Sequence, residues 1–312
     1  MNISTVETLC VNSCFVILLC TTVYYWSKTI FVGESQYQKT GLLGYGSANI
    51  CLTVLLIVRW IDSGHFPLSN LYESLLFLTW CLLILHIYIE MSMKTLFLGV
   101  LTSPAMLCLI AFTDFSLPPE LQKSSPLVPA LQSNWLVMHV TVMIASYAAL
   151  LLGCLVAIAY LIFSKKDGAD STQIQSTLIL ETSPQIDTEK PAESTMSLLK
   201  TQNERVNFLS FLDNLSYRTI GIGFCFLTLG ILSGAVWANE TWGNYWSWDP
   251  KETWAFITWL TFAMYLHSRL IKGWTGSKPA WIASFGFVLV WICYLGVNLL
   301  GQGLHSYGFL QI

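Results

Sequence analysis

Residues 135–163 read WLVMHVTVMIASYAALLLGCLVAIAYLIF, and this run decides the class of fold. It contains no charged side chain. As a helix rising about 1.5 Å per residue, it is longer than the roughly 30 Å hydrocarbon core of a bilayer. The whole chain agrees, because 54% of its residues are hydrophobic and 11% are charged, whereas soluble domains carry about 25% charged residues. The sequence therefore predicts an all-α, polytopic membrane protein.

Similar apolar runs lie on both sides of this one along the chain. Each is long enough, as a helix, to cross a bilayer. Together with the first run they predict about eight transmembrane helices, at residues 9–26, 41–60, 70–89, 95–113, 135–163, 218–238, 253–271 and 280–300.

The distribution of Lys and Arg tests this helix count, because loops on the inner face of a membrane are rich in both residues. Threading eight helices through the bilayer puts 12 of the 15 Lys and Arg residues on one face. The opposite face has only Arg59, Lys123 and Lys251. We therefore expect a basic inner face, with both termini on the outer face.

The spacing of the runs divides the chain into three regions. Residues 1–163 form a five-helix membrane region, and residues 218–312 form a three-helix region with a Trp-rich loop at 237–252 and an outer-face tail. Residues 164–217 are rich in Ser, Thr, Gln and charge and lack a sustained apolar period, which predicts a mobile linker on the inner face. None of the nine cysteines forms a C-x-x-C pair, so a zinc site or covalent c-type haem attachment is not expected.

The Trp-rich loop is the most unusual part of the sequence. The stretch WANETWGNYWSWDPKETWAFITW, residues 237–259, contains six of the 13 tryptophans. An aromatic belt at the membrane interface is the ordinary explanation for a single Trp, but it does not predict Trp242, Trp246 and Trp248 on one loop. These side chains together offer a flat apolar surface with indole N–H donors.

Asp249 directly follows the last of these tryptophans. With Pro250 next to it and Glu252 three positions on, it matches a helix N-cap in a capping box. A helix is predicted to begin here. The capping role of Asp249 can coexist with a functional one.

Three of the five histidines are predicted on the same face as the loop. His139 lies about one turn into the fifth helix, and His305 follows the eighth, among several glycines. His65 lies in an outer loop, where hydrogen bonding within the loop is the ordinary role. Two imidazoles on opposite faces of a porphyrin give a six-coordinate b-type haem iron, so a flat aromatic surface between histidines suits haem.

The other two histidines, His86 and His267, lie deeper. Counting from the predicted caps at Asn70 and Asp249 puts them about 24 Å and about 27 Å along their helices. Ionisable residues at that depth are candidates for function. The depth alone allows an internal pair of haem ligands, and it also allows each histidine to bond to a neighbouring helix.

The residues 242–252, WGNYWSWDPKE, resemble the "WWD" signature of haem-handling membrane proteins. With GHFPLSNLYESL, VPALQSNWLVMHV and GVNLLGQGLHSYG, the chain resembles the CcsA family of cytochrome c biogenesis proteins of plastids and cyanobacteria. The resemblance covers nearly the whole chain and is weakest in the linker. It implies a chain that binds haem b transiently and presents it to apocytochromes c, including cytochrome f, for covalent attachment.

The resemblance also implies which residues hold haem. The loop residues Trp242, Trp246, Trp248 and Asp249 match the haem-holding motif. Histidines matching His139 and His305 are the outer-face axial ligands of the iron.

A histidine matching His267 ligates a second haem within the membrane, and in the family a membrane protein of the CcsB (ResB) type supplies the opposite ligand. His86 has no counterpart in this scheme and remains an alternative ligand. The family implies the chloroplast thylakoid membrane, with the outer face in the lumen and the linker in the stroma. A cyanobacterial thylakoid or plasma membrane is the alternative location.

The family's chemistry joins the thiols of a C-x-x-C-H segment to haem vinyl groups, and the sequence shows no nucleophile or general base arranged for that step. We therefore expect a positioning component of a cytochrome c synthase complex, and whether this chain is itself the enzyme stays open. The alternative function is a haem exporter without an attachment role. A b-type electron carrier is disfavoured, because three histidines lie at or beyond the outer face. No nucleic-acid partner is expected.

Overall fold

The computed structural model describes residues 3–31, 39–123, 132–181 and 193–300, and the regular structure of those residues is entirely helical. The α-helices are α1 (Ile3–Phe31), α2 (Thr40–Ser63), α3 (Leu71–Met93), α4 (Phe97–Ala111), α5 (Pro119–Gln122), α6 (Asn134–Glu181), α7 (Glu193–Trp242), α8 (Pro250–Leu270), α9 (Ser277–Trp291) and α10 (Val297–Leu300). Short π-helical turns, η1 (Phe112–Ser116) and η3 (Ile292–Gly296), extend α4 and α9.

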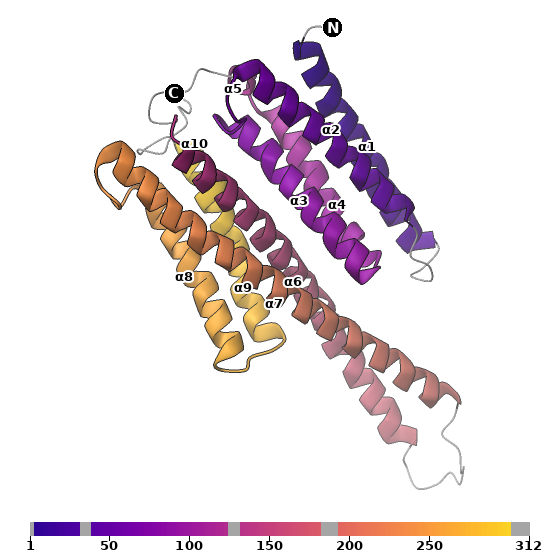
Figure 1. Cartoon of the computed structure of the whole chain (residues 1–312). Coiled ribbons are helices and arrows are strands. Elements are labelled where there is room, and N and C mark those ends of the chain that lie inside the picture. Colours follow the sequence, from indigo (N-terminus) through magenta and orange to yellow (C-terminus); the bar gives the residue numbers. More distant parts are fainter. Residues whose placement is uncertain (1–2, 32–38, 124–131, 182–192, 301–312) are drawn as a thin grey trace.

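Seven helices of the described residues are long and apolar enough to cross a membrane: α1, α2, α3, α4, α6, α7 and α9. The prediction of an all-α, polytopic membrane protein is confirmed. The eighth expected helix, at 253–271, is α8, which packs beside α9 and α7 (Figure 1). It is not among the seven, because several Trp and Thr residues and a His-Ser-Arg end reduce the apolar character of its 21 residues.

The helices form two groups around α6. Helices α1 to α4 pack together on one side, and α7, α8 and α9 on the other (Figure 1). Helix α6 contacts α3, α4, α7 and α9. Its side chains Leu150 and Cys154 are fully buried, so the longest apolar run of the sequence is the centre of the bundle.

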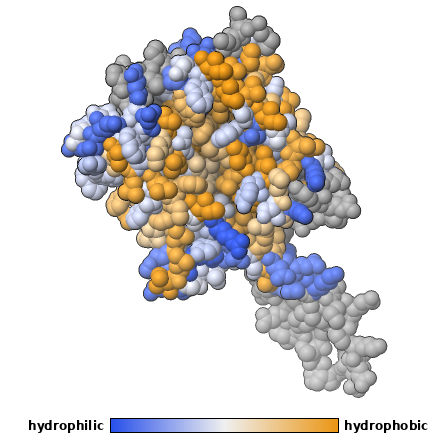
Figure 2. Space-filling model, viewed as in Figure 1, coloured by the Kyte–Doolittle hydropathy of each residue, from blue (hydrophilic) through white to orange (hydrophobic). Residues whose placement is uncertain are grey.

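The surface between the two ends of the bundle is apolar. Figure 2 shows hydrophobic side chains over much of the visible face, with strongly hydrophilic residues mainly at its margins. Leu43 on α2 and Tyr88 on α3 are 71% and 70% exposed. Large apolar side chains in such positions are covered by lipid when the helices lie in a bilayer.

The connections lie at two opposite ends of the bundle. The start of α1, the α2–α3 connection, α5, the α7–α8 loop and α10 lie at one end, and the α3–α4 and α8–α9 connections lie at the other (Figure 1). This arrangement agrees with the predicted outer and inner faces. The first end is termed the outer face and the second the inner face.

The segment 164–217 differs from the expected linker. Helix α6 continues to Glu181 and α7 begins at Glu193, so the segment is helical at both ends. Near its end the segment also packs against the bundle, where Leu212 is fully buried and the rings of Phe208 and Phe97 lie 4.9 Å apart. This packing on the bundle, which the composition of the segment does not indicate, explains the difference. The division of the chain into three regions remains a prediction.

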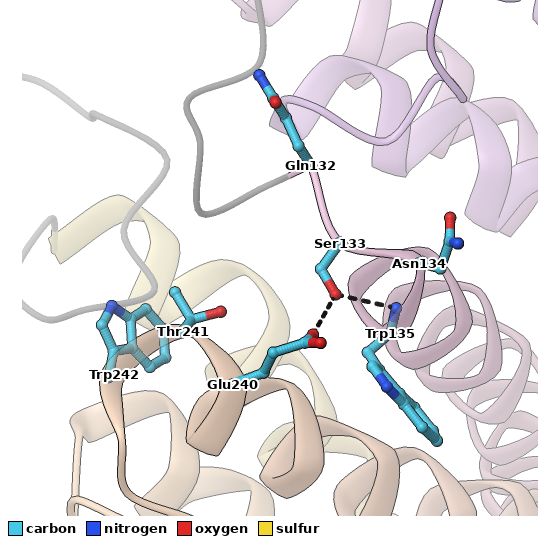
Figure 3. A pocket seen from close by; sticks show the side chains of 7 residues that line it. All are labelled: Gln132, Ser133, Asn134, Trp135, Glu240, Thr241 and Trp242. Carbon is cyan, nitrogen blue, oxygen red and sulfur yellow. Dashed lines mark hydrogen bonds between the residues drawn. The ribbon is translucent and has the colours of Figure 1, made fainter.

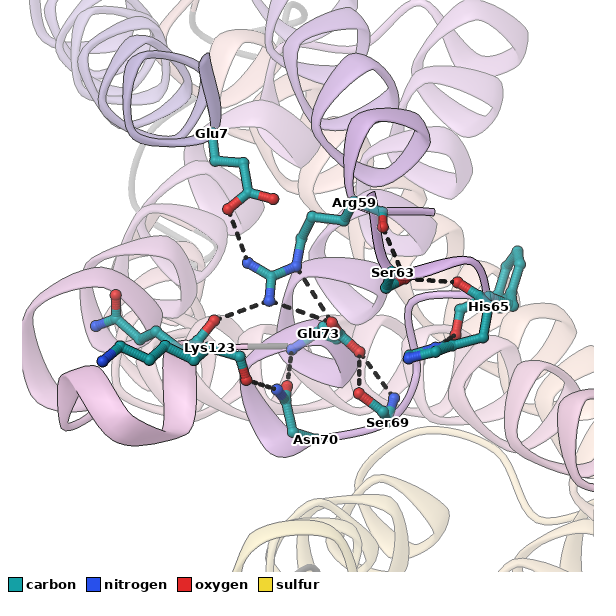
Figure 4. A network of polar contacts seen from close by, with 10 residues as sticks. Glu7, Arg59, Ser63, His65, Ser69, Asn70, Glu73 and Lys123 are labelled. Carbon is teal, nitrogen blue, oxygen red and sulfur yellow. Dashed lines mark hydrogen bonds and ion pairs between the residues drawn. The ribbon is translucent and has the colours of Figure 1, made fainter. Parts of the chain in front are cut away.

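A network of buried charges links the outer ends of α1, α2 and α3 (Figure 4). Arg59, on α2, lies 3.2 Å from Glu73 on α3 and 3.3 Å from Glu7 on α1, and it donates to the Gln122 carbonyl at 2.8 Å. Glu73 also accepts from the backbone N–H of Ser69 at 2.8 Å. One of the three predicted outer-face cations is therefore a buried residue of the helix packing.

Candidate functional site

The Trp-rich loop joins the end of α7 at Trp242 to the start of α8. Asp249 accepts a hydrogen bond from the Lys251 backbone at 3.2 Å, and the Glu252 carboxylate accepts one from the Asp249 backbone at 3.3 Å. This is the predicted capping box, with Pro250 in the first turn, so the prediction that α8 begins here is confirmed.

Glu252 has a second role that the local sequence pattern does not indicate. Its carboxylate accepts from the backbone N–H of Ser247 at 2.8 Å and from the Ser247 hydroxyl at 3.2 Å. Glu252 is buried, and these bonds tie the loop to the first turn of α8. The local sequence indicates only the capping role of Glu252. The bonds to Ser247 depend on the path of the loop, which the sequence pattern does not give.

Trp248 is held in an unusual conformation at the exposed edge of the loop. Its φ angle is 58°, in the left-handed region that bulky residues rarely adopt. Its side chain is 68% exposed, and its carbonyl accepts from the Thr253 hydroxyl at 3.3 Å. Backbone strain of this kind is commonly found at functional sites.

The tryptophans of the loop and of the last turns of α7 form two edge-to-face pairs. Trp246 and Trp248 have ring centroids 5.8 Å apart, and Trp242 and Trp237 have centroids 4.8 Å apart. The indole Nε1 of Trp246 is buried and has no hydrogen-bond partner within the described part of the chain. Buried donors are normally satisfied, so this N–H is available to an acceptor on a ligand.

His139 lies beside the second of these pairs. Its ring stacks on Trp237, with centroids 6.2 Å apart and planes 14° apart. Its Nδ1 lies 2.7 Å from the backbone carbonyl of Gly230 on α7. Because a carbonyl only accepts, Nδ1 carries the proton, and in the neutral ring Nε2 then carries the lone pair, which is the type of atom through which histidines ligate metals.

A cavity of about 710 Å³ opens between the start of α6 and the end of α7. Its size is in the range of small-molecule sites, roughly 300–1,000 Å³. The Ser133 hydroxyl donates to Glu240 at 2.7 Å across it and accepts from the Trp135 backbone at 3.2 Å (Figure 3). The cavity is lined by Gln132, Ser133, Asn134, Trp135, Glu240, Thr241 and Trp242. The cavity thus shares Trp242 with the aromatic pair beside His139.

The predicted site residues are therefore brought together in part. Trp242 and His139 are linked through Trp237, whereas Trp246 and Trp248 form the neighbouring pair on the loop. His305 lies outside the described residues.

The two deep histidines have different surroundings. His86 is fully buried, with Nε2 2.7 Å from Glu90 and Nδ1 2.8 Å from the Thr102 hydroxyl. His267 is exposed near the inner end of α8. The structure does not bring these two side chains together, because one faces the interior of the first helix group and the other faces outward from the second.

His65 has the ordinary role expected of a loop residue. Its Nδ1 lies 3.2 Å from the Phe66 carbonyl, and its own carbonyl accepts from the Ser63 hydroxyl at 3.0 Å. The residues that the structure describes contain no cluster of three His, Cys, Asp or Glu side chains able to hold a bare metal ion. Axial ligation of a haem iron by single histidines requires no such cluster.

Comparison with known proteins identifies close relatives. Residues 68–305 match the cytochrome c assembly protein family. The chain is 70% identical to the cytochrome c biogenesis protein CcsA of Chlorella vulgaris, over 100% of this chain and 99% of that protein. It is 52% identical to CcsA of Mesostigma viride and 46% identical to CcsA of Microcystis aeruginosa, each over 99% of both chains.

Proposed function

This chain belongs to the cytochrome c assembly protein family, and we propose that it holds haem b at the outer-face Trp-rich loop and presents it to apocytochromes c, including cytochrome f, for covalent attachment. Haem is then a transient cargo of this chain. The comparisons support a multi-pass membrane protein of cytochrome c biogenesis. The haem site and the partners are our proposal.

The observation that carries the proposal is the arrangement of His139. Histidines that bind metals usually donate their other ring N–H to a carbonyl or carboxylate, which fixes the tautomer and the direction of the ring. His139 has such a partner in the Gly230 carbonyl at 2.7 Å. Its stacking on Trp237, and the contact of Trp237 with Trp242, connect the candidate ligand to the cavity and the loop.

Two loop residues fit a flat cargo. The Trp246 indole N–H is a buried donor without a partner among the described residues, and a carboxylate of haem is an acceptor of the required kind. Trp248 is exposed on the outer face, where its ring offers a flat apolar contact. His305 is the proposed second axial ligand, by resemblance to the family, and Asp249 acts on the site through the cap of α8.

His267 fits a different task. It is exposed on α8, and Phe256, Leu260 and Met264 lie exposed at helical spacing on the same helix. An ionisable side chain that faces outward beside exposed apolar side chains of the same helix is a candidate for contact with a partner. We propose that this surface meets a CcsB-type membrane protein, with His267 as one ligand of a haem held between the two chains.

The contribution of this chain to attachment is positional. The cargo supplies the vinyl groups and the apocytochrome supplies the thiols. The aromatic pairs would supply flat apolar contact for the haem ring, and His139 would supply one oriented ligand to its iron. Holding reacting groups in one orientation lowers the barrier by removing much of the entropy loss of the encounter.

The relatives support the proposed location. CcsA proteins of algae, such as that of Chlorella vulgaris, and of cyanobacteria are similar to this chain over almost all of its length. We propose the chloroplast thylakoid membrane with the Trp-rich loop in the lumen. The cyanobacterial thylakoid or plasma membrane is the alternative.

The visible spectrum of the detergent-purified chain tests the proposal. It is recorded with and without a co-expressed CcsB-type partner, and with His139, His267 or His305 changed to Gly. His65→Gly is the matched control. We expect the haem Soret absorbance to fall in the His139→Gly and His305→Gly variants and to return with added imidazole. The His267→Gly effect should depend on the partner.

A wild-type complex that carries no haem under any of these conditions would overturn the proposal. Haem binding without co-purification of an apocytochrome would favour the exporter function.

A further inference from the structure

We infer that Gly234 is a positioning residue for His139. Gly234 lies on α7, directly facing the imidazole on α6. The inference rests on the proposed function, in which His139 binds the haem iron. It adds a residue outside the Trp-rich loop to the machinery of the site and gives a physical reason for glycine at that position.

The first observation is the space at Gly234. A Cβ atom added there would lie 2.5 Å from both Nδ1 and Cε1 of His139 and 3.2 Å from Nε2. Carbon atoms in contact normally lie about 3.5–4.0 Å apart. Any side chain at position 234 therefore displaces the imidazole or separates α7 from α6.

The second observation is that the imidazole cannot move without losing its bond. Nδ1 is tied to the Gly230 carbonyl at 2.7 Å. Gly230 and Gly234 are four residues apart on α7, so they lie on one face, one turn apart. A ring displaced from Gly234 loses the hydrogen bond that keeps the proton on Nδ1 and the lone pair on Nε2.

The neighbouring α6–α7 contacts behave differently and provide a control. A Cβ at Gly223 would lie 2.8 Å from the side chain and 3.0 Å from the backbone N of Leu150. Gly223→Ala thus crowds the same helix pair without touching His139. Gly221 has open space around it, so Gly221→Ala tests the effect of a helical alanine alone.

The test compares haem affinity of Gly234→Ala, Gly223→Ala and Gly221→Ala by titrating haem into the haem-free full chain, purified with its partner. We expect Gly234→Ala to bind haem about 10- to 100-fold more weakly, the range typical for loss of a group that orients a metal ligand. Gly221→Ala should bind as wild type, and Gly223→Ala should lose thermal stability with a smaller loss of affinity.

A double variant separates positioning from general packing. In the His139→Gly background, with no imidazole added, Gly234→Ala should have no further effect on haem affinity, because no ring is left for the alanine to displace. An equal loss with and without the His139 side chain would overturn the inference, because the alanine would then act through helix packing.

A measurement on the haem-free chain keeps the inference separate from the proposed function. The rate at which diethyl pyrocarbonate modifies His139, followed by mass spectrometry, reports the surroundings of its ring nitrogens. Gly234→Ala should change this rate and Gly223→Ala should not. An unchanged rate contradicts the inference. A changed rate with no haem bound by the wild type contradicts only the proposed function.

Discussion

The imidazole Nε2 of His86 and the carboxylate of Glu90 lie 2.7 Å apart, and neither side chain is exposed. The other Glu90 oxygen accepts from the Tyr25 hydroxyl at 2.6 Å, and Nδ1 of His86 lies 2.8 Å from Thr102. Both ring nitrogens therefore have partners inside the first helix group. This geometry favours a role for His86 in joining α1, α3 and α4 over the alternative role of a haem ligand.

Removing one partner of this network should destabilise the chain strongly. Glu90→Leu leaves His86 and Tyr25 without their acceptor, and leaving a buried hydrogen-bonding group unsatisfied typically costs about 1–3 kcal/mol for each group. The thermal unfolding midpoint of the detergent-solubilised chain measures the loss, with Glu120→Leu, on the exposed helix α5, as the control. A His86→Gln variant that loses haem while keeping wild-type stability would contradict the structural role.

Asp249 should act on haem only through the cap of α8. Asparagine is also a good N-cap, so Asp249→Asn should retain haem. Asp249→Ala should lower stability by about 1 kcal/mol and reduce haem occupancy, as the loop loses its anchor. Absorbance and unfolding are measured on the same samples. Loss of haem in a stable Asp249→Asn chain would indicate direct contact between the carboxylate and the cargo.

The strained backbone at Trp248 should lower the stability of the chain, while the Trp248 ring contributes to haem binding. Glycine adopts positive φ angles without the steric penalty, roughly 1–2 kcal/mol, that an L side chain has in the left-handed region. Because the Trp248 ring is mostly exposed, Trp248→Gly should leave stability unchanged or slightly higher while haem binding falls. Trp274→Gly, at the inner face, is the control for loss of an exposed indole. A large loss of stability in Trp248→Gly would contradict this interpretation of the strained backbone.

Lys251 should make stability depend on pH. Burial lowers its pKa from 10.5 to about 8, although Cys293 and Asp249 act in the opposite direction. Between those two pH values the unfolded chain binds a proton that the folded chain does not, so raising the pH from about 8 to about 10.5 should stabilise the fold. Below about 8 the unfavourable charged form persists.

The unfolding midpoint measured across this pH window tests the prediction. Lys251→Met should remove the rise in the unfolding midpoint with pH. This variant also loses the hydrogen bond from Nζ to Asn298. Lys278→Met, on the inner face, should retain the rise in the midpoint with pH. A wild-type chain whose midpoint is flat over the window would contradict the effect of burial on the Lys251 pKa.

The chain's local patterns were sufficient for the elements that depend on neighbouring residues. The caps at Asn70 and Asp249 were both predicted, because a cap requires only a side chain and the next turn of backbone. The expectation of a mobile linker over 164–217 did not include the helices at its two ends, and Phe208 and Leu212 pack on another part of the bundle. Arg59 was assigned to the outer face, but its burial against Glu73 depends on three helices meeting.

The sequence by itself determined the membrane class of the fold and the start of α8, and it supplied the candidate histidines and tryptophans, since hydropathy, capping and residue type are local properties. Only the tertiary structure decided which of those residues meet. His139 acquires its proton position from Gly230, 91 positions further along the chain, and His86 is enclosed by residues of α1, α3 and α4. Hydrogen bonds and steric contact act over a few ångströms in space, and only the packing of the helices brings such distant residues within that range.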